Sequence, residues 1–151
     1  MFESTAELYV HAIAMEREAA ERYAEFSHRM ADEGNTDVAA LFARLAAQES
    51  EHLATLRRRT AGVELPPLEA DYSWSPRRPA TPHQALGIAL CAEKCARSFF
   101  EQAQRVADDP GLRALAREMS AEEGEHIAMI EALLARTPEA VVDWAALYDA
   151  R

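Results

Sequence analysis

Two segments of this chain carry the same potential metal ligands in the same order. In each segment a glutamate is followed, after a similar interval, by a Glu-x-x-His pair. The set consists of Glu16, Glu49, His52, Glu93, Glu123 and His126. Residues three apart share a helix face, so the Glu and the His of each pair can approach one metal ion together. Ligands of this kind, converging inside a four-helix bundle, predict a dinuclear carboxylate site.

The charges of these side chains support a metal site over an ordinary core. Each of the six lies within an apolar stripe, and a carboxylate buried without a partner costs several kcal/mol. Mixed oxygen and nitrogen ligation with open positions suits iron or manganese. We expect two iron ions, with a manganese or mixed-metal pair as the alternative. Glu49 and Glu123 could bridge both metals, while Glu16 and Glu93 each bind one.

A single Glu-x-x-His match is weak evidence in a chain with 26 acidic residues and five histidines. A third match, Glu25 with His28, illustrates this. We interpret it as part of a solvated face, because Gln102 and Arg105 stand at the matching positions of the second half. The evidence for the other two pairs is that their segments align with each other, and that the apolar residues around them align as well. A bundle whose core polar residues are coincidental is the competing interpretation.

Helical periodicity and capping residues predict the elements that hold these ligands. Ser4 begins a capping box, and proline follows both Thr81 and Asp109, as is common at the start of a helix. The expected helices cover residues 5–32, 37–60, 82–108, 110–136 and 138–149. The fold class is therefore all-α: a single domain over 1–151, built as a four-helix bundle with a short C-terminal fifth helix.

Residues 62–80 contain four prolines and predict an extended crossover between the second and third helices. About 19 residues at ~3.3 Å each can reach ~60 Å, which exceeds a helix length of roughly 40 Å. The third helix could therefore run parallel to either the first or the second. We expect a homodimer, with the fifth helix and the crossover residues Tyr72 and Trp74 as subunit contacts.

Composition excludes several classes of function. The net charge is −10, with no basic stripe for phosphates, so we expect no nucleic-acid partner. No apolar stretch is long enough to span a membrane, and the N-terminus does not resemble a signal peptide, so we expect a cytoplasmic protein. Cys91 and Cys95 form no C-x-x-C pair. They lie on the helix face opposite Glu93, which predicts packing or surface thiols.

These motifs together resemble the rubrerythrin branch of the ferritin-like superfamily, over residues of about 5–135. The segment from Glu16 to Tyr23 is similar to that family's first iron-binding helix, and the paired Glu-x-x-His helices complete the pattern. The resemblance implies that the six side chains named above are the metal ligands. It also implies a catalytic role for Tyr23, as a tyrosine that hydrogen-bonds a ligating carboxylate. An ordinary core tyrosine is the alternative.

The chain also departs from that family. We expect no rubredoxin domain, so we expect a separate protein or small reductant to donate electrons. Ala96 stands where rubrerythrin peroxidases carry an extra glutamate, and Phe100 replaces a second tyrosine. We expect an oxidoreductase that reduces peroxide or O₂ at a di-iron centre. A ferroxidase or iron-binding module, and a non-catalytic bundle stabilised by metal, are the alternatives.

Overall fold

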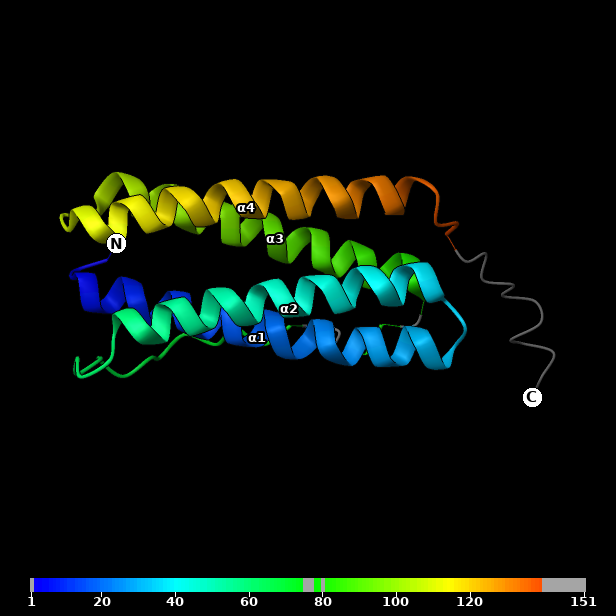
Figure 1. Cartoon of the computed structure of the whole chain (residues 1–151), viewed down its shortest axis with the longest axis horizontal. Helices are drawn as coiled ribbons and strands as arrows, with labels where there is room; N and C mark the ends of the chain where they lie inside the picture. Colours follow the sequence, from blue (N-terminus) through cyan, green and yellow to red (C-terminus); the bar gives the residue numbers. More distant parts are fainter. Residues whose placement is uncertain (1, 75–77, 80, 140–151) are drawn as a thin grey trace.

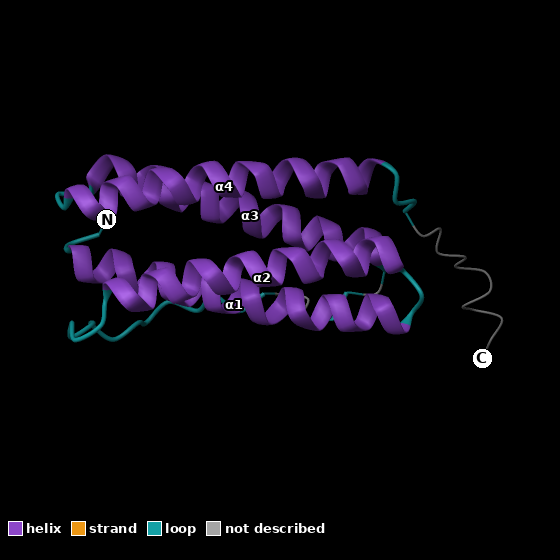
Figure 2. Cartoon of the chain, viewed as in Figure 1, coloured by secondary structure: helices purple, strands orange, loops and turns teal. Residues whose placement is uncertain are grey.

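The computed structural model describes residues 2–74, 78–79 and 81–139, and these residues form four long helices and no strand. The helices are α1 (Thr5–Asp32), α2 (Thr36–Arg59), α3 (Pro82–Val106) and α4 (Pro110–Ala135). Figures 1 and 2 show them as one elongated bundle, with loops only at its ends and along one side. The predicted all-α four-helix bundle with a long crossover is confirmed. The predicted fifth helix, 138–149, lies almost wholly outside the described residues.

Three of the four helices begin at the side-chain caps that the sequence indicates. Each cap accepts a hydrogen bond from a backbone N–H three residues ahead, which satisfies a group that the helix itself cannot pair. These caps are Ser4, Thr81 and Asp109, with N···O distances of 3.1, 3.0 and 2.7 Å. Asn35 occupies the same position before α2 but makes no side-chain cap. The turn there depends on Gly34, whose φ of +80° a residue with a side chain rarely adopts.

The crossover determines how the two helical hairpins are arranged. α1 and α2 are antiparallel, and so are α3 and α4. α2 ends and α3 begins at opposite ends of the bundle, so α3 is parallel to α2 (Figure 1). The crossover is fastened to α1 on the way: the Tyr72 hydroxyl hydrogen-bonds the ring of His11, and the Trp74 backbone N–H donates to Glu18 at 3.2 Å.

The aromatic residues of the crossover contribute to packing within the chain. The ring of Trp74 lies 5.1 Å from that of Tyr23 and 6.1 Å from that of Phe26, centroid to centroid. Tyr72 packs edge-on against His11. The two side chains that we expected at a subunit contact therefore make contacts within the chain, and their part in a subunit contact stays a prediction.

The core consists of two apolar clusters, one toward each end of the bundle. Phe26, Phe42 and Ile130 belong to the first cluster, and Leu56 and Phe100 belong to the second. The buried glutamates and histidines lie between the two clusters, about halfway along each helix. This arrangement places the polar layer inside an apolar bundle, where electrostatic interactions are strong because water is largely excluded.

Candidate metal centre

All six sequence-predicted ligands converge on the middle of the bundle. Each helix contributes at least one of them, and none is more than 8% exposed. They are Glu16 on α1, Glu49 and His52 on α2, Glu93 on α3, and Glu123 and His126 on α4. Their ligand atoms fall into two groups of four, within each of which the atoms lie no more than 4.8 Å apart. The structure thus brings the six together, and their binding of metal stays a prediction.

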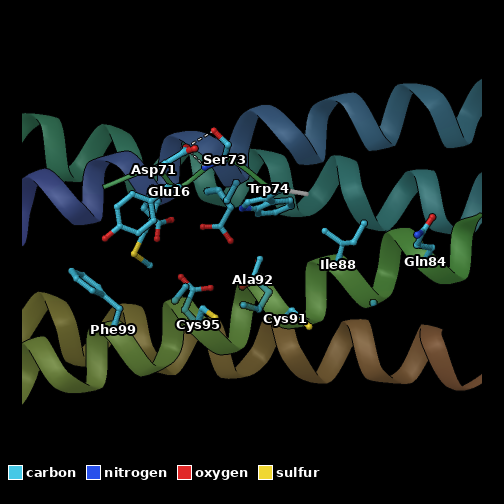
Figure 3. A pocket seen from close by; sticks show the side chains of 18 of the residues that line it. Glu16, Asp71, Ser73, Trp74, Gln84, Ile88, Cys91, Ala92, Cys95 and Phe99 are labelled. Atoms are coloured by element: carbon cyan, nitrogen blue, oxygen red, sulfur yellow. Dashed lines mark hydrogen bonds between the residues drawn. The ribbon is translucent and has the colours of Figure 1, made fainter. Parts of the chain in front are cut away.

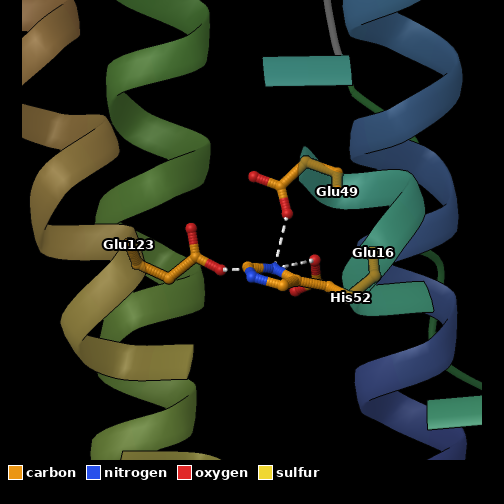
Figure 4. A group of neighbouring side chains, drawn as sticks. All are labelled: Glu16, Glu49, His52 and Glu123. Atoms are coloured by element: carbon orange, nitrogen blue, oxygen red, sulfur yellow. Dashed lines mark hydrogen bonds and ion pairs between the residues drawn. The ribbon is translucent and has the colours of Figure 1, made fainter. Parts of the chain in front are cut away.

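The first group surrounds the Nδ1 atom of His52 (Figure 4). Glu49 Oε2 lies 3.0 Å from this nitrogen, Glu16 Oε2 lies 3.2 Å from it, and Glu123 Oε1 lies 3.6 Å from it. Glu49 and His52 come from the same helix face, whereas Glu16 and Glu123 reach the site from α1 and α4. Three carboxylates from three helices therefore face one imidazole nitrogen.

The second group repeats this arrangement around Nδ1 of His126. Glu49 Oε1 lies 2.9 Å from this nitrogen, Glu123 Oε2 lies 3.0 Å from it, and Glu93 Oε2 lies 3.1 Å from it. Glu49 and Glu123 therefore belong to both groups, with one oxygen directed to each imidazole. Glu16 and Glu93 belong to one group each. The two rings lie 6.0 Å apart, centroid to centroid.

The hydrogen bonding of the cluster indicates that cations fit here. A ring nitrogen carries at most one proton, so it cannot satisfy three carboxylates at once. Among the described residues, Glu49 Oε1 and Glu123 Oε1 are buried and accept no hydrogen bond of acceptable geometry. Buried carboxylate oxygens without donors are costly unless a cation compensates them. The donor set, four carboxylates and two imidazoles, is one that iron and manganese prefer.

Without a bound cation, protons offset part of the negative charge of the cluster. Burial raises the pKa of Glu16 well above its usual range, and the charge of Glu49 raises it further. Burial also raises the pKa of Glu123 to about 9. Burial alone would raise the pKa of Glu49, but close contacts with Glu16 and both imidazoles lower it below its usual range. Burial alone would lower the pKa of His52 and His126, but hydrogen bonds to the surrounding carboxylates raise it to about 12.

Sequence reasoning missed the contact that Glu122 makes. By register this residue corresponds to Gln48, which has no carboxylate, so the sequence does not indicate a ligand that both halves share. In the structure, Nε2–H of His52 donates to Glu122 Oε2 from the other hairpin. The carboxylate therefore orients the imidazole whose other nitrogen faces the cluster. The contact arises from the packing of α4 against α2, which the sequence does not reveal. The only signal in the sequence is the position of Glu122 next to Glu123.

Tyr23 lies against the second group. Its hydroxyl donates to Glu93 Oε1 across the bundle, and its ring is fully buried and stacks on Phe42. Burial raises the pKa of Tyr23 well above its usual range, and the charge of Glu93 raises it further, so the hydroxyl stays protonated and remains a donor. Phe100, the matching residue of the second half, lies in an apolar cluster. A catalytic role for Tyr23 stays a prediction.

The two thiols are separate from both ligand groups. Cys91 and Cys95 are exposed and unpaired, so the predicted surface position is confirmed. Both nevertheless line the same cavity as Glu93. Within the described part of the chain, the helices lack the run of apolar residues that crossing a bilayer requires.

Comparison with known proteins finds one matching family and two similar structures of note. A family model described as a ferritin-like domain matches residues 6–140. The structure of an uncharacterised conserved protein from Magnetospirillum magnetotacticum MS-1 is similar, with 31% identity, a TM-score of 0.83 and coverage of 92% of this chain and 99% of that one. Bacterioferritin BfrA of Mycobacterium tuberculosis shares the fold at 21% identity and a TM-score of 0.75, over 86% of this chain and 83% of that one. The search of curated proteins gives no match.

Proposed function

The chain belongs to the family of ferritin-like domains, and from this premise we propose that its central cluster binds two iron ions and reduces peroxide or O₂. The observation that carries the proposal is the sharing of Glu49 and Glu123 between two four-residue groups. Each of these carboxylates directs one oxygen to each imidazole. Manganese, or one ion of each kind, suits the same donors.

The side chains would divide the work of holding the two ions. Glu49 and Glu123 would bridge them, whereas Glu16 with His52, and Glu93 with His126, would each hold one. Four carboxylates carry four negative charges, which two divalent ions balance. When bound and reduced, the two ions supply two electrons to an O–O bond and polarise it. The chain's own contribution is to fix the ligands and keep most of the site out of water.

One feature supports a rubrerythrin-like version of this activity, and another departs from it. The Tyr23 hydroxyl donates to Glu93, which keeps that carboxylate oriented toward one ion. Ala96 offers no carboxylate at the position beyond Glu93, so the site has no alternative ligand there. Both metals would therefore stay in place during turnover. Electrons would come from a separate protein or small reductant.

A ferroxidase that handles iron for another destination is the alternative. It uses the same six donors, and membership of the ferritin-like family supports it equally. A non-catalytic bundle stabilised by metal is the third possibility. These functions differ in what happens to the iron after oxidation: a peroxidase or oxidase retains it, and a ferroxidase passes it on.

Stopped-flow mixing of the anaerobic di-ferrous protein with peroxide and, separately, with O₂ tests the proposal. We expect rapid oxidation, faster with peroxide, and retention of both iron ions through repeated cycles of reduction. Oxidation by O₂ followed by loss of iron to a chelator would favour the ferroxidase. No oxidation by either reagent, in a protein shown to hold two iron ions, would exclude both redox functions.

Metal analysis of Glu49→Ala and Glu123→Ala tests the ligand assignment directly. Because each residue serves both groups, either change should reduce loading of both ions. Glu118→Ala is a matched control, since Glu118 is an exposed glutamate of α4. Retention of two metals per chain in both variants would show that the assignment is wrong.

A further inference from the structure

A large cavity opens beside the candidate metal centre. It has a volume of about 980 Å³ and lies between α1, α3 and the crossover (Figure 3). Its inner wall includes all four glutamates of the cluster: Glu16, Glu49, Glu93 and Glu123. Cavities of roughly 300–1,000 Å³ are typical of sites for small organic ligands. The volume is far more than peroxide or O₂ needs.

The remaining walls of the cavity are mainly apolar. The apolar side chains come from α1, the crossover and α3, and they include Met15, Trp74, Ile88, Ala92, Ala96 and Phe99, whereas polar residues such as Asp71 and His83 line the rest. The two alanines create the space, because each leaves a turn of α3 without a bulky side chain beside Glu93. An apolar chamber that ends in a few convergent polar groups is the usual design of a ligand site.

The cavity exists because the crossover covers one face of α1 but leaves the matching face of α3 uncovered. By register, His11 and Glu18 of α1 correspond to Ile88 and Cys95 of α3. His11 and Glu18 hydrogen-bond the crossover, which therefore covers that face of α1. Ile88 and Cys95 line the cavity instead. Two positions that bind the crossover in the first half of the chain therefore line the cavity in the second half.

We propose that this cavity binds an uncharged, apolar organic molecule, with part of the molecule against the four carboxylates. The apolar walls provide the driving force for binding. The acidic inner wall, in a chain of net charge −10, disfavours an anion, and a cationic group would lose its hydration against the apolar walls. Use of this molecule as a substrate rests on the proposed function, because it would lie beside the metal ions. Its binding does not require metal.

A second copy of the chain fits this cavity less well than a small molecule. Among the described residues, the large hydrophobic side chains that are mainly exposed are Val63 and Val106, and neither lines the cavity. The apolar walls are therefore turned inward and do not form a protruding patch. Glu49 and Glu123 line the chamber although they are almost fully buried. Only a small molecule can reach these two carboxylates.

Titration with N-phenyl-1-naphthylamine, an uncharged apolar fluorophore, tests this inference on the full metal-free chain. We expect saturable binding of one probe per chain. Ile88→Trp and Ala96→Phe fill the chamber from two positions, and each should raise the Kd about 10-fold or more. Ala132→Trp, on an exposed site of α4, is the matched control and should leave the Kd unchanged. Helical content and iron loading of each variant show whether it folds.

Three results would overturn the inference: probe binding that does not saturate, a Kd in both filled variants equal to that of the original protein, or probe binding that falls as light scattering shows self-association. The last would assign the cavity to a second copy. The titration also separates this inference from the proposed function. Probe binding by a chain that takes up no iron would leave the cavity assignment intact and reject the di-iron centre.

Discussion

His52 and His126 occupy matching positions, but their surroundings differ. Nε2 of His52 donates to the carboxylate of Glu122, whereas the register places the neutral Gln48 in the corresponding position of the other half. A carboxylate at the far nitrogen makes an imidazole a stronger donor to a metal. On the other side, Tyr23 supports Glu93. The two halves therefore present similar ligands, but the residues that hydrogen-bond those ligands differ. We expect two inequivalent metal sites.

Replacement of Glu122 by glutamine should weaken one metal site selectively. The variant keeps the size of the side chain but removes the charge that orients His52, and losses of such partners typically cost about 10- to 100-fold in affinity. Competition with a chelator should show one weakened Mn²⁺ site and one unchanged site. Glu118→Gln, at an exposed position of the same helix, should behave like the original protein. Equal weakening of both sites would contradict the assignment.

Metal affinity should rise with pH. In the metal-free protein the pKa of Glu123 is about 9 and that of both imidazoles is about 12, so these groups hold protons at neutral pH. Metal binds their deprotonated forms, so each binding event must release protons. Mn²⁺ titration in weak buffer should acidify the solution and show tighter binding at about pH 8 than at about pH 6. Binding without proton release would show that the cluster is not the site.

The helices depend on local signals, and the crossover depends on contacts across the bundle. Ser4, Thr81 and Asp109 could be predicted as caps because each acts within one turn of its own helix. The direction of α3 could not, because a crossover long enough to span the bundle permits either direction. The contact of Glu122 and the cavity beside Glu93 were missed for the same reason. Both depend on how one hairpin packs against the other.

Trp74→Ala tests how much the crossover stabilises the bundle. The indole packs against Tyr23 and Phe26 and is partly buried, so its loss should lower the free energy of unfolding by about 2 kcal/mol, below the range for a fully buried tryptophan. Urea denaturation of the metal-free protein would measure this change. Val63→Ala, at a residue that is 51% exposed, should change it by less than about 0.5 kcal/mol. Equal effects would show that Trp74 does not fasten the crossover.

Stability of the entire molecule should depend on metal. The polar layer divides the core into two apolar clusters, and repulsion among its carboxylates opposes folding until cations or protons balance it. Mn²⁺ at about 100 times its Kd should stabilise the native state by about 2.7 kcal/mol per site. Anaerobic calorimetry should therefore show a higher Tm with Mn²⁺, and no rise in a Glu49→Ala, Glu123→Ala double variant. A rise in that variant would point to binding elsewhere.

The pairing of helices has a consequence for how the protein could be divided. α1 packs closely on α2 and α3 on α4, whereas close approaches between the two hairpins are few. The bundle can thus be regarded as two helical hairpins that are joined by the crossover and by the polar layer between them. If the chain were cut at Glu69, an exposed residue of the crossover, we expect the pieces to reassemble more tightly with Mn²⁺ than without it. Metal would then control whether the two pieces of the split protein associate.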